Sequence, residues 1–185
     1  FRRVLFRSNE ITRAKYVGGQ GEPRMTVAQR ELKRCIEGLD QKALFNILTF
    51  SGGVDPWLED GVRDAGARSR DEAKEFVDRL GAMGGTNLYG ALRQAFEDPD
   101  VDTIFVLSDG EQTIDCGCSS GYYWDCSAAQ CRQPAIDAAD ALKADGVTIF
   151  AWGFGGVSEE TLEALASDAD KAKFSNRSEE HTSEL

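Results

Sequence analysis

Thr103-Ile-Phe-Val-Leu-Ser-Asp-Gly110 is the clearest indicator of the fold class in this 185-residue chain. Its apolar residues run together without interruption and are followed at once by Ser108, Asp109 and Gly110. A short, continuously apolar run that ends in turn residues is typical of a strand covered on both faces, as in a parallel sheet. The sequence therefore predicts that Asp109 follows the carboxyl end of a buried strand.

Two further apolar runs of the same kind occupy residues 43–50 and 147–152. Apolar residues at helical spacing predict helices over 25–38, 70–80, 88–96, 135–144 and 159–166, the last of them N-capped by Ser158. Residues 54–57 predict a short edge strand, because Pro56 cannot donate to a ladder. Strands alternating with helices predict an α/β fold: a Rossmann-like, mostly parallel central sheet flanked by helices.

The two ends of the chain read as opposite strands of one DNA string. One codon choice for residues 177–184 (Arg-Ser-Glu-Glu-His-Thr-Ser-Glu) has a reverse complement that encodes residues 1–8 (Phe-Arg-Arg-Val-Leu-Phe-Arg-Ser). This string resembles a sequencing adapter, so residues 1–8 and 177–185 are expected to be foreign to the protein. The predicted domain is then 9–176, and the natural protein is expected to continue beyond both ends.

Composition narrows the classes of function. The chain has 32 Asp and Glu against 21 Lys and Arg, a formal net charge of −11, which argues against binding nucleic acid or anionic membrane surfaces. The single histidine, His181, lies in the adapter-like C-terminal segment, so the predicted domain has no histidine for a catalytic triad or a zinc site. It has no Gly-x-x-x-x-Gly-Lys-Ser/Thr phosphate loop and no segment that predicts membrane insertion. These absences count against an enzyme.

Two polar features fall where ligands bind in α/β sheets, at the carboxyl ends of the strands. Asp109 follows its strand, and Thr86 lies in the Gly84-Gly-Thr-Asn87 loop just before a predicted helix. Either feature alone is most often only a turn or a helix cap. Together, and in this order, they indicate a functional site.

Four blocks of the sequence, residues 45–50, 84–92, 104–110 and 147–155, resemble the von Willebrand factor type A (VWA) family in order and spacing. The resemblance implies a protein-binding (adhesion or interaction) module rather than an enzyme. In that family an Asp-x-Ser-x-Ser loop, a Thr and an Asp form a metal-ion-dependent adhesion site, and Thr86 and Asp109 match the last two. The Asp-x-Ser-x-Ser loop has no match, so the first central strand, which carries it, is expected to be missing.

The resemblance further implies Mg²⁺, or Mn²⁺ or Ca²⁺, in the intact parent, with a protein partner donating a Glu or Asp to the metal. Thr86 and Asp109 alone supply one hydroxyl and one carboxylate, so weak or absent metal binding is expected from this chain. The lost strand also predicts low stability. Residues 4–6 could take its place, which would bring Arg3 and Arg7 near the metal position.

A cysteine-rich insertion is predicted at about 111–132, whereas Cys35 lies on the apolar face of a predicted helix. A zinc site built from four cysteines favours Cys-x-x-Cys spacing, which is absent, so two disulfides are the preferred interpretation. Cys116 and Cys118 would each pair with Cys126 or Cys131. Disulfides predict an extracellular, cell-surface or periplasmic protein.

The same insertion holds three aromatic residues that are candidate partner contacts: Tyr122, Tyr123 and Trp124.

Two other functions stay open. The first is a VWA-type subunit of a cytoplasmic chelatase or AAA-ATPase complex, and free thiols in the native protein would be evidence for it. The second is a non-catalytic part of a larger enzyme.

Overall fold

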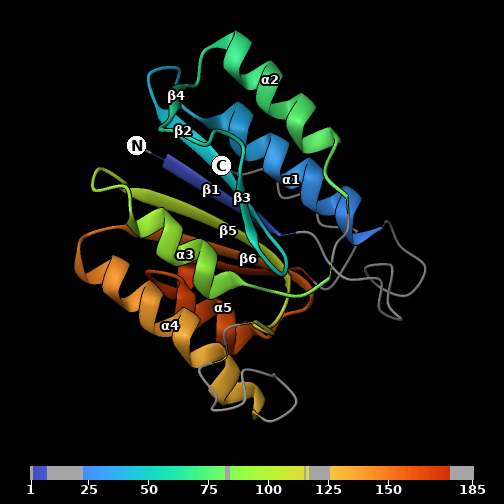
Figure 1. The fold of residues 1–185 in the computed structure, drawn as a ribbon, viewed down its shortest axis with the longest axis vertical. Helices are drawn as coiled ribbons and strands as arrows, with labels where there is room; N and C mark the ends of the chain where they lie inside the picture. Colours follow the sequence, from blue (N-terminus) through green and yellow to red (C-terminus); the bar gives the residue numbers. More distant parts are fainter. Residues whose placement is uncertain (1, 8–22, 82–83, 115, 117–125, 176–185) are drawn as a thin grey trace.

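The computed structural model describes residues 2–7, 23–81, 84–114, 116 and 126–175. Its strands run in the order β3-β2-β1-β5-β6-β7, with β4 pairing to β2 (Figure 1). The strands are β1 (Arg2–Arg7), β2 (Leu44–Phe50), β3 (Val54–Pro56), β4 (Arg63–Asp64), β5 (Thr103–Gly110), β6 (Thr148–Gly156) and β7 (Ala172–Ser175). The helices are α1 (Arg24–Gly38), α2 (Ala67–Asp78), α3 (Leu88–Phe96), α4 (Ala128–Ala144), α5 (Glu159–Leu165) and the 3₁₀ helix η2 (Ala169–Lys171).

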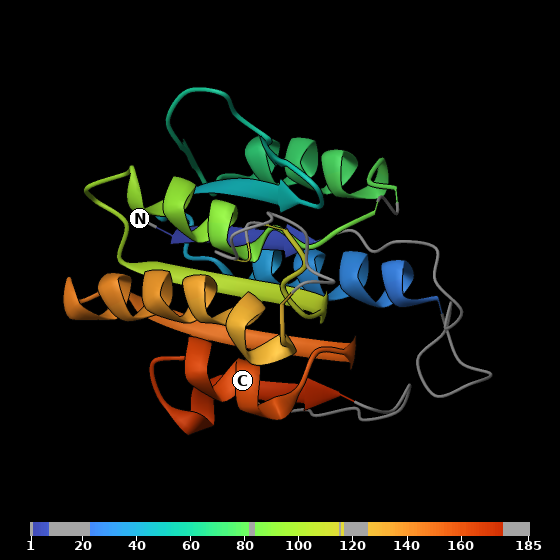
Figure 2. The same cartoon turned by 60° about the horizontal axis from the view of Figure 1, so that its bottom comes forward.

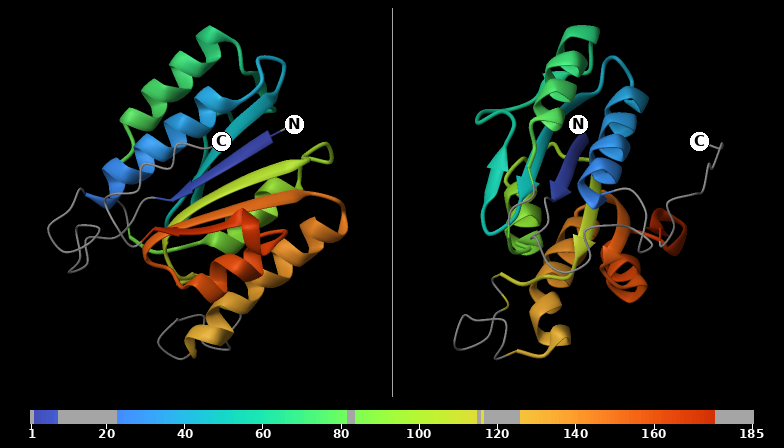
Figure 3. Two further views of the ribbon diagram at one scale, coloured as in Figure 1. Left: turned by 180° about the vertical axis from the view of Figure 1, so that it is seen from behind. Right: turned by 90° about the vertical axis from the view of Figure 1, so that its right-hand side faces the viewer.

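Helices cover both faces of the sheet. Figure 2 shows α3 and α4 side by side over one face, and Figure 3 shows α1 and α2 together over the other. Along β5, Ile104 and Val106 are buried with α3 and α4, whereas Leu107 is buried with α1 and α2. Side chains of a strand alternate between its faces. A strand buried on both faces needs apolar residues in succession, and the predicted α/β fold with a mostly parallel sheet is confirmed.

The elements differ from the predicted ones chiefly in α4. This helix begins at Ala128, inside the stretch 111–132 assigned to the cysteine-rich insertion, and it contains Pro134. A proline normally argues against a helix interior because it removes one hydrogen bond. Here a capping box between Ser127 and Gln130 satisfies donors of the first turn and starts the helix upstream of the proline. The insertion is therefore shorter than predicted.

The place of the first central strand is not empty. Residues Arg2–Arg7 form β1 and pair in parallel with both β2 and β5. The adapter-like residues thus take the place of the first central strand, as the sequence analysis allowed, and the chain still lacks an Asp-x-Ser-x-Ser loop. Arg7 pairs with Phe50 at the carboxyl edge, whereas Arg3 pairs with Asn46 and Ile104 near the start of the strand. Only Arg7, and not Arg3, lies at the edge of the expected metal position.

Removing residues 1–8 should abolish cooperative folding. Without β1, the facing sides of β2 and β5 lose their pairing partner in the middle of the sheet, and exposed strand edges favour aggregation. Thermal unfolding followed by circular dichroism, with size-exclusion chromatography, should show a non-cooperative, aggregated chain. Removal of residues 177–185 is the control and should leave the melting curve unchanged. A monomeric, cooperative melt of the chain without residues 1–8 would contradict this prediction.

Candidate metal-binding edge

Asp109 lies at the carboxyl end of β5 and is buried, with 3% of its surface exposed. The pairing between β5 and β6 changes register here: Ser108 pairs with Gly153, but Gly110 pairs with Gly156. Such irregularities let a strand end present a side chain in a direction that a regular ladder would not allow. The predicted buried strand is confirmed, but it extends through Gly110, so Asp109 lies within its last residues rather than after its end.

Thr86 lies in the loop before α3 and is fully buried. Its N–H donates to Thr113 Oγ1 (2.7 Å), and its carbonyl oxygen accepts from the N–H groups of Thr113 (3.0 Å) and Ile114 (3.1 Å). Thr113 and Ile114 follow Asp109 closely in the chain. These bonds bring the loop of Thr86 to the same edge of the sheet as Asp109, as the sequence predicted for both residues.

Gly85 fixes the loop from the other side. Its φ is +84°, a conformation that L side chains rarely adopt, and a Cβ there would lie 3.3 Å from the backbone of Gly52 and from Ile114 Cδ1. Gly52 lies in the turn between β2 and β3. Three segments from different parts of the chain therefore meet at this edge, and only glycine allows their close approach.

The hydroxyl of Thr86 is the unusual group at this edge. Its Oγ1 is buried and has no hydrogen-bond partner among the residues that the structure describes. Leaving a buried hydroxyl unpaired costs about 1–3 kcal/mol, so such groups are rare unless they have a ligand. A metal ion that accepts oxygen ligands fits this hydroxyl and the carboxylate of Asp109. The described residues include no cluster of three or more His, Cys, Asp or Glu suited to a metal, so the fit is partial.

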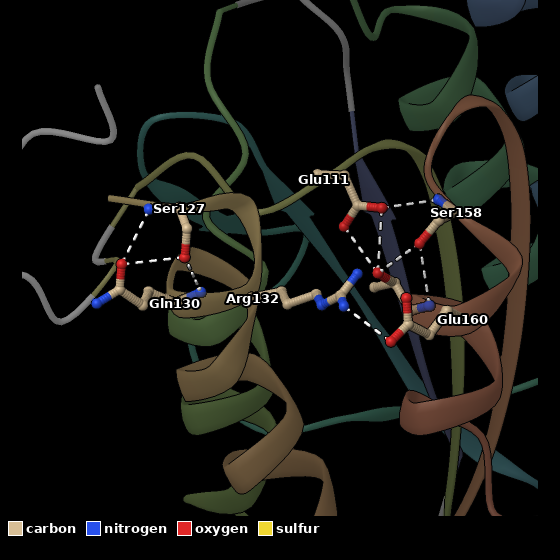
Figure 4. A network of polar contacts seen from close by, with 7 residues as sticks. Glu111, Ser127, Gln130, Arg132, Ser158 and Glu160 are labelled. Atoms are coloured by element: carbon tan, nitrogen blue, oxygen red, sulfur yellow. Dashed lines mark hydrogen bonds and ion pairs between the residues drawn. The ribbon is translucent and has the colours of Figure 1, made fainter. Parts of the chain in front are cut away.

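The segment after Asp109 is also anchored to α5 (Figure 4). The carboxylate of Glu111 accepts from the N–H of Ser158 (2.7 Å) and from the hydroxyl of Thr161 (2.8 Å). Ser158 is the N-cap of α5, as the sequence predicted. Beside this network an ion pair of 2.9 Å joins Arg132 of α4 to Glu160 of α5. Glu111 could not be predicted from the sequence, because its partners lie 47 and 50 residues away in the chain.

The disulfide interpretation is confirmed for one pair, Cys116 with Cys131. Cys126 is disulfide-bonded as well. Because Cys131 is paired with Cys116, the predicted scheme pairs Cys126 with Cys118. Cys35 is free, and burial, helped by the charge of Glu31, raises the pKa of its thiol to about 12. Cys118 lies outside the described residues, as do the three candidate contact aromatics, Tyr122, Tyr123 and Trp124.

Thiol counting tests the disulfides. Protein purified without reductant and denatured before alkylation should carry one label, on Cys35. In the native state Cys35 should react slowly at pH 8, because its raised pKa keeps the thiol protonated and burial limits access. Mass spectrometry of the labelled peptides makes both measurements, and prior reduction should yield five labels, one for each cysteine of the chain. Five labels without prior reduction would contradict the disulfides and favour the cytoplasmic alternative.

Comparison with known proteins identifies the family. The family described as "von Willebrand factor type A domain" matches residues 18–169, and the chain belongs to it. The human von Willebrand factor A domain-containing protein 3A is 29% identical over 86 residues, which is 46% of this chain and 7% of that protein. The chain thus spans a small part of this relative. No helix in the described residues is long and apolar enough to cross a membrane.

Solved structures share the fold. A von Willebrand factor type A protein from Catenulispora acidiphila superposes with a TM-score of 0.63 at 22% identity, over 94% of this chain and 37% of the other. Proximal thread matrix protein 1 from the mussel byssus, with a zinc-occupied metal-ion-dependent adhesion site, superposes with a TM-score of 0.61 at 15% identity, over 94% of this chain and 40% of that one. Domains of this fold are thus known to hold divalent metals.

Proposed function

We propose that residues 9–176 are part of a protein-binding module whose metal-ion-dependent adhesion site uses Thr86 and Asp109 as ligands. The observation that carries the proposal is the hydroxyl of Thr86, buried and without a partner among the described residues. The expected ligand in the intact parent is Mg²⁺, or Mn²⁺ or Ca²⁺. The remaining ligands would come from an upstream Asp-x-Ser-x-Ser loop.

The chemistry of a divalent ion suits adhesion. Mg²⁺ requires six oxygens and releases its waters reluctantly, so a site with few protein ligands leaves positions open. A Glu or Asp of a protein partner can then complete the shell, which gives a strong and directional contact. Thr86 and Asp109 would hold the ion from the protein side, while their burial fixes their positions.

In this chain the site should bind metal weakly. Thr86 and Asp109 supply two ligand groups, whereas Mg²⁺ requires six oxygens. Binding weaker than micromolar is therefore expected, and it should still be specific for this edge.

A Mn²⁺ titration followed by NMR tests the proposal. The paramagnetic ion should broaden the amide signals of Thr86 and Asp109 before those of the opposite edge of the sheet. Thr86→Val and Asp109→Asn should each remove the selective broadening, because each deletes a ligand group while nearly keeping the shape. Thr103→Val, at the other end of β5, is the matched control and should behave as the wild type. Broadening that is uniform, or unchanged in both variants, would count against the site.

The cysteine-rich insertion is proposed to shape the choice of partner. It follows β5, whose carboxyl end holds Asp109, and the disulfide between Cys116 and Cys131 closes its base onto α4. Aromatic side chains are enriched in protein interfaces, and the insertion supplies three: Tyr122, Tyr123 and Trp124. Disulfides support an extracellular, cell-surface or periplasmic location.

Replacing Tyr122, Tyr123 and Trp124 with serine should change which peptides the module binds. In the presence of Mn²⁺, an immobilised library of peptides that each carry a Glu or Asp should yield different or fewer sequences with the variant. The selective Mn²⁺ broadening at Thr86 should persist, because the metal ligands are untouched. Selection of the same peptides at the same strength would show that the aromatics serve only the insertion itself.

A further inference from the structure

Gln112 is a buried amide that joins the end of β5 to the start of α3. It is 3% exposed, and its Oε1 accepts from the N–H groups of Leu88 (2.8 Å) and Tyr89 (3.2 Å). The first N–H groups of a helix have no partner within the helix, so they need an outside acceptor. Gln112 supplies one, and its Nε2 donates in turn to the carbonyl of Ile114. The amide therefore holds the start of α3, two residues after Thr86, against the segment that follows Asp109.

Thr113 holds Thr86 itself. Its hydroxyl accepts from the N–H of Thr86, while the N–H groups of Thr113 and Ile114 donate to the carbonyl of Thr86. Both backbone polar groups of Thr86 are thus satisfied by these two residues. The hydroxyl of Thr86 is the polar group of this residue that remains without a partner among the described residues.

These contacts link the two proposed ligands through a short stretch of chain. Residues 112–114 begin three positions after Asp109, and they fix the backbone of Thr86 on one side while Gly85 packs against Gly52 on the other. A site in which ligands come from separate loops depends on such supporting bonds for its geometry.

We propose that Gln112 and Thr113 are positioning residues for the hydroxyl of Thr86 as a metal ligand. This proposal rests on the proposed function, and neither side chain is proposed to touch the metal. Residues that orient metal ligands typically change affinity by about 10- to 100-fold when they are replaced. Loss of the Thr113 hydroxyl should have an effect of this size, because it leaves the N–H of Thr86 without its acceptor.

Thr113→Val and Thr113→Ser form a matched pair for the test. Valine keeps the shape and removes the acceptor, whereas serine keeps the hydroxyl. Thr113→Val should weaken the Mn²⁺-dependent broadening at Thr86 by about tenfold or more, and Thr113→Ser should stay close to the wild type. Hydrogen exchange of the Thr86 amide should accelerate in Thr113→Val but not in Thr113→Ser. The two variants should have similar melting temperatures.

Gln112→Met provides the second test, with Gln133→Met as its control. Gln133 is an exposed glutamine of α4 whose side chain donates to Asp137. Gln112→Met should accelerate exchange at the amides of Leu88 and Tyr89 and weaken Mn²⁺ broadening, and Gln133→Met should change neither. A merely structural role would accelerate exchange throughout the chain and leave the relative Mn²⁺ response at Thr86 unchanged.

The outcomes separate this proposal from the one on which it rests. If the wild type shows selective broadening at Thr86 and Thr113→Val shows it equally, the positioning role is overturned while the metal site stands. If the wild type shows no selective broadening at all, the proposed function fails and the positioning role fails with it. Unchanged exchange of the Thr86 amide in Thr113→Val would also overturn the positioning role.

Discussion

Strand β5 is hydrogen-bonded on both sides, to β1 and to β6, and is covered by helices on both faces. Its burial places Asp109 at a fixed point on the carboxyl edge. The chain that leaves β5 is then tied within a few residues to three other elements: to α5 by Glu111, to α3 by Gln112 and to the Thr86 loop by Thr113. The candidate site exists because one buried strand end organises the loops around it.

This arrangement explains why the buried hydroxyl of Thr86 can persist without a partner among the described residues. The backbone around it is held by hydrogen bonds that do not involve the hydroxyl. Leaving a buried hydroxyl without a hydrogen bond costs about 1–3 kcal/mol. A domain with a typical free energy of unfolding of about 5–15 kcal/mol tolerates that cost. A bound metal ion would offset that cost, which links ligand binding to the stability of the whole edge.

Much of the fold was predictable from local patterns. The apolar run of β5, the span of α3 and the N-cap Ser158 all follow from residues that are neighbours in sequence. Asp109 could be assigned to this edge from the end of its strand, and Thr86 from its place in a Gly-rich loop just before a helix. Gln112 and Glu111 could not be assigned, since their roles depend on partners far away in the chain. The start of α4 could have been predicted from the Ser127 and Gln130 capping box, which the presence of Pro134 obscured.

We propose that this edge is one part of a metal-dependent adhesion site whose other part is an Asp-x-Ser-x-Ser loop encoded before Asn9 in the natural protein. The decisive measurement is the parent coding sequence before the codon for Asn9. We expect it to encode an apolar strand in place of Arg2–Arg7 that ends in Asp-x-Ser-x-Ser. A strand without those oxygen ligands would contradict it, and the domain would then be a metal-free scaffold with the cysteine-rich insertion as the better candidate for partner binding.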